Sequence, residues 1–238
     1  MYHPEPDGDA EFIELRNTSD SVTLDLGGAY FSAGVEFTFP GGTMLAPGER
    51  ILVVRSVAAF EAAHGAGLRI AGEFANGSSL NNAGESVKLD DAGGSTIAEI
   101  DYDDRYPWPL PADEGYSLVY ISGDPGAAAN WRSSAARGGN PGSSDAMPYS
   151  GGSLIGYALA SPAPWVESAD FDFFRYTVNV AADAAAVIPE WSGDLGGWES
   201  DALTLVDQIA HGDGTSDMVW RLPRGTAGFV RLRISLRE

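Results

Sequence analysis

The chain has 238 residues, 44% of them hydrophobic, with 30 glycines, 14 prolines and no cysteine. The lack of cysteine excludes a disulfide framework, a thiol nucleophile and a cysteine-ligated zinc site. The formal net charge of −20 at pH 7 repels phosphate backbones and argues against nucleic-acid binding as a main role.

This acidity has three interpretations, which the sequence leaves open. It can keep the surface of an exported or salt-adapted protein soluble, it can bind divalent cations, or it can dock a basic partner. The sequence contains no signal peptide and no apolar run near the ~20 residues of a membrane helix. Abundant glycine and proline without a collagen repeat are typical of an all-β protein with many turns.

Short β-type runs separated by turns fill the chain from Met1 to about Trp131. Alternating or continuous apolar residues predict strands at 22–26, 35–39, 50–55 and 116–121. The run at 50–55, RILVVR, is apolar enough for a strand buried on both faces. Residues 56–65 are the one clear helical stretch, which Ser56 can cap and Gly65 can end. A hairpin is predicted at 85–102, around the turn DDAGG.

A second module follows a segment of linker composition. Residues 133–152 are small, polar and rich in glycine and proline, which is typical of a linker. We therefore predict one domain at 1–145 and a smaller β module at 153–238. The smaller module has a short helix or strand at 154–160 and strand candidates at 171–180, 185–192, 201–209 and 229–236. Its size suits a small β-sandwich or half-barrel.

The order of motifs in the first domain resembles the bacterial lamin-tail domain family over about residues 1–145. The motifs that carry this resemblance include MYHP at 1–4, EFIEL at 11–15, FTFP at 37–40 and LAPGE at 45–49. The resemblance implies an immunoglobulin-like β-sandwich with no catalytic residues to carry over. Two positions depart from the family pattern: Tyr30 stands where a tryptophan is common, and His3 replaces an asparagine.

The second module resembles a C-terminal β module of large exported proteins from Verrucomicrobia-type and planctomycete-type bacteria. The matching residues form three groups along the chain: Leu154, Tyr157, Ala158 and Leu159; Val187, Glu190, Ser192, Asp194, Leu195 and Trp198; and Phe229, Arg231, Leu232 and Ile234. This resemblance implies a small β-sandwich near the end of an exported protein.

Acidic clusters are the candidate metal sites. Calcium takes six to eight oxygen ligands, and glycine-rich loops supply carbonyl oxygens beside the carboxylates. The candidate calcium ligands are Asp101, Asp103 and Asp104 in one cluster and Asp213 and Asp217 in another, with Asp7 and Asp9 as a third pair. The alternative at each place is a solvated turn that uses aspartate and glycine for its geometry.

Two tryptophans flanked by prolines are candidate binding residues. Trp108 in YPWPLP and Trp165 in SPAPWVES lie where proline disfavours a place inside a sheet. An exposed, rigid ring can stack on a sugar or anchor a protein partner. The alternative is a ring folded back over an open end of the sandwich.

Nothing in the sequence predicts catalysis. The three histidines are His3, His64 and His211, and no nucleophile elbow accompanies them. His64 ends the predicted helix, where the helix dipole favours a cation. Paired carboxylates of the kind that glycosidases use arise by chance among 34 acidic residues.

These observations predict a non-catalytic structural, adhesive or interaction module of a larger exported bacterial protein. We expect an extracellular or cell-envelope location, a protein or polysaccharide partner of the envelope, no nucleic acid, no membrane span, and calcium as an optional ion. The alternative is a carbohydrate-binding accessory module of a secreted hydrolase. Met1 falls inside the first strand of the lamin-tail pattern, so we expect the native protein to extend further in front of it.

Overall fold

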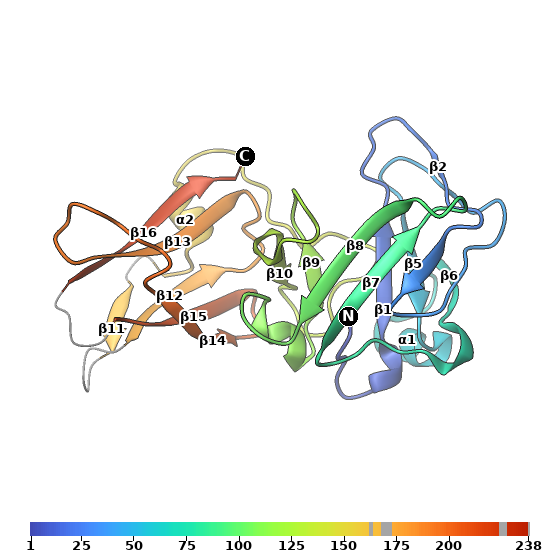
Figure 1. The fold of residues 1–238 in the computed structure, drawn as a ribbon, viewed down its shortest axis with the longest axis horizontal. Coiled ribbons are helices and arrows are strands. Elements are labelled where there is room, and N and C mark those ends of the chain that lie inside the picture. The colour runs from blue at the N-terminus through green and yellow to red at the C-terminus, as the bar shows by residue number, and fades with distance from the viewer. Residues whose placement is uncertain (162–163, 168–172, 224–227, 238) are drawn as a thin grey trace. The chain divides into compact units, whose positions relative to one another are not determined.

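A computed structural model of the chain describes residues 1–161, 164–167, 173–223 and 228–237. The chain divides into two compact units, Met1–Ser144 and Asp145–Glu238. Both are built mainly from β-strands, in agreement with the predicted all-β class (Figure 1). Among the described residues, no helix has the length and apolar character needed to cross a membrane.

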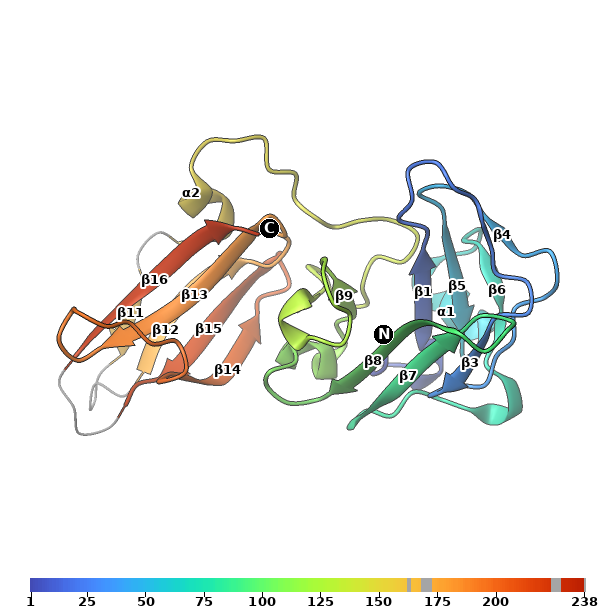
Figure 2. The same ribbon diagram turned by 45° about the horizontal axis from the view of Figure 1, so that its top comes forward.

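Unit 1 contains two three-stranded sheets. One has the order β1-β5-β6, where β5–β6 is parallel, and the other has the antiparallel order β3-β7-β8. The elements are β1 (Phe12–Arg16), β2 (Leu24–Asp25), β3 (Tyr30–Ala33), β4 (Met44–Leu45), β5 (Arg50–Val54), α1 (Val57–His64), β6 (Ile70–Glu73), β7 (Gly84–Asp90), β8 (Thr96–Asp103), β9 (Leu118–Tyr120) and β10 (Trp131–Ser133). Figure 2 shows the two sheets as separate layers.

Strand β5 is buried on both faces, as its apolar run predicted. Ile51 and Val53 enter the main core between the sheets, whereas Leu52 and Val54 face a second cluster that includes Phe60 of α1. Each side chain of β5 after Arg50 is therefore in contact with one of two cores.

The predicted helix is confirmed with its ends. The Ala59 N–H donates to Ser56 Oγ at 3.3 Å, and the Gly65 N–H donates to the Glu61 carbonyl. Gly65 has φ +82°, a region that glycine enters without strain.

Two predicted strands are wrong in part. Only Leu24–Asp25 of segment 22–26 is a strand, which pairs with β4 in a separate two-stranded sheet. The side chains of Val22 and Leu24 are exposed, whereas Leu26 and Leu45 of β4 enter the main core. Segment 35–39 is not a regular strand, although Phe37 and Phe39 exchange backbone hydrogen bonds with residues 28–31 around an isolated bridge between Tyr30 and Thr38. Its buried side chains, Val35 and Phe39, still face the core as the apolar alternation indicated.

Unit 2 contains a four-stranded sheet of order β11-β12-β15-β14 and the two-stranded antiparallel sheet β13-β16. The elements are α2 (Leu154–Ala158), β11 (Trp165–Glu167), β12 (Phe173–Asn179), β13 (Ala185–Ser192), β14 (Thr204–Ala210), β15 (Thr215–Arg221) and β16 (Phe229–Leu236). Tyr176 and Trp220 lie in its core, where the Trp220 indole donates to the Tyr176 hydroxyl at 3.2 Å.

The segment of linker composition contributes to both units. Ser133 and Ser134 are fully buried in unit 1, and the Ser134 N–H donates to the Ser117 carbonyl. Tyr149 packs against Tyr157 in unit 2 at a centroid distance of 4.9 Å.

Candidate functional site

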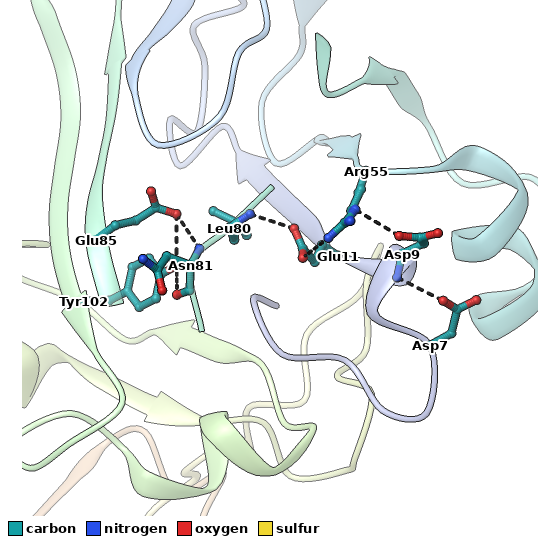
Figure 3. A network of polar contacts seen from close by, with 8 residues as sticks. All are labelled: Asp7, Asp9, Glu11, Arg55, Leu80, Asn81, Glu85 and Tyr102. Carbon is teal, nitrogen blue, oxygen red and sulfur yellow. Dashed lines mark hydrogen bonds and ion pairs between the residues drawn. The ribbon is translucent and has the colours of Figure 1, made fainter. Parts of the chain in front are cut away.

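The most connected polar network of unit 1 surrounds Glu11, directly before β1 (Figure 3). This side chain is 3% exposed. Its carboxylate accepts hydrogen bonds from Arg55 Nη1 at 2.8 Å and from the Leu80 N–H at 2.7 Å. The Arg55 N–H also donates to the Glu11 carbonyl at 2.9 Å. The single residue Glu11 therefore joins the start of β1, the end of β5 and the loop before β7.

The network continues on both sides of Glu11. Arg55 Nε lies 3.0 Å from the Asp9 carboxylate. The Asp9 N–H donates to the carboxylate of Asp7, which caps a short 3₁₀ turn. Near Leu80, the Tyr102 hydroxyl lies 2.7 Å from the Asn81 carbonyl and 3.2 Å from Glu85. Asp7 thus caps a turn and Asp9 forms an ion pair with Arg55. These contacts fit the alternative to a calcium site, a turn that uses aspartate for its geometry.

Burial explains the protonation behaviour of this network. Burial raises the pKa of Glu11, although the Leu80 N–H and the Arg55 guanidinium oppose that rise. Burial, reinforced by the nearby Glu85 carboxylate, raises the pKa of Tyr102 far above its ordinary value. Because the hydrogen bonds of Glu11 and Tyr102 join separate segments of unit 1, we assign both side chains a structural role.

The predicted calcium ligands of β8 lie near one another and have few partners. Asp101 and Asp103 lie on the outer face of β8, and Asp104 follows directly. The Arg105 N–H donates to Asp103 Oδ1 at 3.0 Å. A hydrogen bond with Asp103 raises the pKa of Asp104, so these two carboxyl groups crowd each other.

The other predicted calcium ligands are engaged by neighbouring groups of unit 2. Asp213 accepts the Thr215 hydroxyl at 2.6 Å and the Thr215 N–H at 3.0 Å, contacts that lower its pKa. Asp217 is 8% exposed and accepts the Thr177 hydroxyl at 2.7 Å, with Arg175 at 3.7 Å. Within the described ranges, no three or more His, Cys, Asp or Glu side chains gather into a group that could hold a metal ion.

The structure does not show either candidate binding tryptophan as an exposed ring. Trp108 is 6% exposed, belongs to the main core and contacts Trp131 at a centroid distance of 6.1 Å. The interpretation of Trp108 as an exposed ring is therefore wrong, and the alternative of a ring folded back onto the sandwich holds. Trp165 begins strand β11, and its backbone pairs with Arg175 of β12, so the expectation that proline keeps it out of a sheet is wrong. Its side chain is outside the described part of the structure.

The histidines occupy three unrelated places. His3 Nδ1 lies 2.8 Å from Asp113, and His211 Nδ1 lies 3.0 Å from the Thr215 hydroxyl. His64 packs against Phe12 and Phe60, and burial lowers its pKa. Packing thus favours neutral His64, contrary to the expected cation at the helix end.

One further cluster combines residues that carried the resemblance of the second module with Arg233, which the sequence did not single out. Glu190 in β13 is 7% exposed and accepts the Nε–H groups of Arg231 and Arg233 of β16, each at 2.8 Å. The Arg231 guanidinium lies 4.0 Å from the centre of the Trp198 ring. Three of the residues that carried the resemblance of the second module are therefore one stacked ion-pair cluster across β13 and β16.

A polar hollow of about 420 Å³ opens beside this cluster. It is lined by Trp191, Ser192, Gly193, Asp194, Gly197 and Glu199. The Gly196 and Gly197 N–H groups donate to the Asp194 carboxylate and lower its pKa. Asp194 thus shapes the loop, whereas the Glu199 side chain is exposed and makes no ion pair in the described part of the chain.

The fold and the sequence of unit 1 agree on its class. Unit 1 is an immunoglobulin-like β-sandwich, in which two sheets face each other and β5 is buried between them and α1. Residues 1–104 match the Lamin Tail Domain family, which is a non-catalytic domain family, so unit 1 contains a lamin tail domain as the motifs indicated. The match ends before residues 105–145, and no catalytic family is found. No curated protein matches the chain.

Replacing Glu11 by glutamine should destabilise unit 1. Glutamine keeps the shape but has one acceptor oxygen, whereas the two carboxylate oxygens of Glu11 accept separately from Arg55 and from the Leu80 N–H, so one donor is left facing the amide NH2 group. An unsatisfied buried hydrogen-bonding group costs about 1–3 kcal/mol, and we expect a loss in this range, measured by urea denaturation. The control Asp20→Asn, in an exposed loop, should match the wild type within about 0.5 kcal/mol. Equal stability of the two variants would contradict the assignment of Glu11.

Replacing Glu190 by glutamine should change the pH dependence of unit 2. Arg233 and Arg231 hold the pKa of Glu190 below its ordinary value. A lowered carboxyl pKa contributes stability above the unfolded pKa, and this stability is lost as the pH falls through the folded pKa. Glu190→Gln should therefore lower the Tm at pH 7, and the difference should close in acid.

Calorimetry from pH 7 to pH 3 measures this difference. The exposed Glu199→Gln serves as the control and should follow the wild type at each pH. A gap between Glu190→Gln and the wild type that stays constant over this range would show that charge pairing is not its cause.

Proposed function

We propose that the chain is a non-catalytic structural or interaction part of a larger exported bacterial protein. The observation that carries this proposal is the use of the buried carboxylates. Glu11 and Glu190 each bind arginine across neighbouring segments, and Asp217 binds Thr177 within a sheet. Each therefore holds neighbouring strands or segments together. The non-catalytic Lamin Tail Domain family supports the same conclusion for unit 1.

An extracellular or cell-envelope place suits the surface of the chain. The net charge of −20 favours solubility in a salty medium, and a chain without cysteine needs no redox control of thiols. A protein or polysaccharide of the envelope is the partner that this place offers. The resemblance of the second module to parts of exported proteins supports the same location.

A carbohydrate-binding role is the second candidate, and the hollow beside β13 is the observation that favours it. Trp191 is half-buried at its wall, and Ser192, Asp194 and Glu199 provide polar atoms around it. Sugar sites combine an aromatic ring with polar groups that fix the orientation of the ligand.

Enzyme assays and polysaccharide columns separate these candidates. For the proposed role we expect no turnover on glycoside, peptide and phosphoester substrates, and no retention on polysaccharide that depends on Glu199. Retention that Glu199→Gln abolishes and the exposed Asp201→Asn preserves would favour the carbohydrate-binding role. Turnover that a single carboxylate substitution abolishes would contradict the non-catalytic proposal.

Calcium binding stays a prediction, and Asp101 and Asp103 are the carboxylates best placed for it because both are exposed. A ligand that binds only the folded state stabilises it by RT ln(1 + [L]/Kd). Calcium added to chelator-treated protein should therefore raise the Tm, and Asp101→Asn should reduce the rise. The control Asp20→Asn should leave the rise intact. An unchanged Tm at millimolar calcium would contradict the prediction.

A further inference from the structure

Strand β8 is an open edge of the β3-β7-β8 sheet. It pairs with β7 along its whole length, from Gly84 opposite Asp103 to Asp90 opposite Thr96. No other strand in the described ranges pairs with it, and Figure 1 shows it at the margin of its sheet. In an antiparallel sheet, alternate N–H and C=O groups of an edge strand point away from its neighbour and stay available for a further strand.

This edge lacks most of the devices that usually protect an edge strand, and the charged side chains of its outer face are the one that it has. Its eight residues contain no proline, lysine or glycine, and the only irregularity in its pairing lies at the end opposite Asp90. Proteins usually blunt an edge of this length with proline, lysine, a bulge or a covering segment. The backbone of β8 is therefore built to accept another strand.

The two faces of β8 differ in chemistry. Tyr102 belongs to the main core and Ile100 packs against it, and Ala98 lies on the same face and is half-buried. The alternate residues Ile97, Glu99, Asp101 and Asp103 lie on the outer face and are exposed. Three carboxylates at a spacing of two residues thus follow one apolar side chain, which is 51% exposed.

Positive charge compensates this acidic row only at one position. Lys88 of β7 lies 3.9 Å from Glu99. Asp101 faces Ser86 across the strand pair and makes no ion pair within the described part of unit 1. At the end of the strand Asp103 and Asp104 lie close together, and the Arg105 guanidinium is 3.5 Å from Asp104.

The charge of the row decides which occupant fits. A second copy of the chain would place acidic side chains opposite acidic side chains, and like charges directly opposite in a sheet are destabilising. The net charge of −20 adds to this repulsion. An extended segment with basic side chains at alternate positions avoids the penalty and gains a cross-strand ion pair at each carboxylate.

We propose that the edge of β8 binds an extended basic segment of a partner polypeptide as an added β-strand. Arginine or lysine side chains of the partner lie opposite Glu99, Asp101 and Asp103, and an apolar side chain packs on Ile97. Backbone hydrogen bonds supply affinity, and the alternating charges supply specificity. This inference rests on the proposed interaction role and names the class of partner for it.

A labelled peptide tests the proposal on the full chain. The probe is a fluorescein-labelled peptide of alternating arginine and valine or threonine, titrated by fluorescence anisotropy in buffer with EDTA. We expect saturable binding, and hydrogen exchange should show new protection of β8 amides. The same peptide N-methylated at every residue keeps its charge and loses its strand donors, so it should bind at least ~10-fold more weakly, or about 1.4 kcal/mol.

Matched charge reversals separate the edge from the overall field. The double variant Glu99→Lys/Asp101→Lys should weaken binding at least ~10-fold. The control Asp20→Lys/Glu61→Lys changes the net charge equally at exposed sites away from β8 and should bind like the wild type. Calorimetry checks that both variants remain folded.

Four outcomes would overturn the proposal. They are equal binding of the N-methylated peptide, equal losses in the two double variants, self-association of the wild type through β8 in sedimentation, and failure of the peptide to bind. The last outcome removes β8 as the docking edge but leaves the non-catalytic role standing, because that role is tested separately by turnover and polysaccharide retention.

Discussion

The buried carboxylate of Glu11 is the interaction on which unit 1 depends most. A carboxylate with 3% exposure is costly unless arginine and backbone donors surround it, and here Arg55 and the Leu80 N–H both do. These partners come from positions 44 and 69 residues further along the chain. Satisfying one charge therefore fixes the start of β1, the end of β5 and the approach to β7. The stacked rings of Tyr2 and Tyr102, 4.7 Å apart, lie at the same junction.

The two-sided burial of β5 provides the framework for that interaction. Val53 and Val54 are both 0% exposed but face different clusters, so the strand cannot slip by one residue without exchanging its two cores. Helix α1 covers one side through Phe60, and the second sheet covers the other. Because β5 ends at Val54, this fixed register is also what sets the backbone of Arg55 opposite Glu11.

The sequence was sufficient where a local pattern decides the structure. The apolar run at 50–55 and the caps Ser56 and Gly65 predicted β5 and α1, and the order of motifs predicted the lamin-tail fold. Long-range contacts decided the rest. Trp108 resembled an exposed ring because prolines flank it, yet it packs on Trp131, 23 positions later. Likewise, alternation at Val22 and Leu24 cannot reveal that their side chains are exposed, whereas Leu26 enters the main core. For Glu190, sequence order could not show that Arg231 lies opposite it and that Arg233, opposite Ile188, reaches it diagonally, since only the register of β13 and β16 brings them together.

Negative charge has two separate uses in this chain, which a single net value of −20 conceals. Carboxylates that are buried, such as Glu11 and Glu190, are matched by arginine, and their contribution is to the fold. Carboxylates on the outer face of β8 are mostly unmatched, although the strand itself is long and open at its edge. An edge of this kind would pair with a second copy if its outer face were neutral. The acidic row blocks that pairing and leaves a basic strand as the complementary occupant, so one row of side chains prevents self-association and selects the partner.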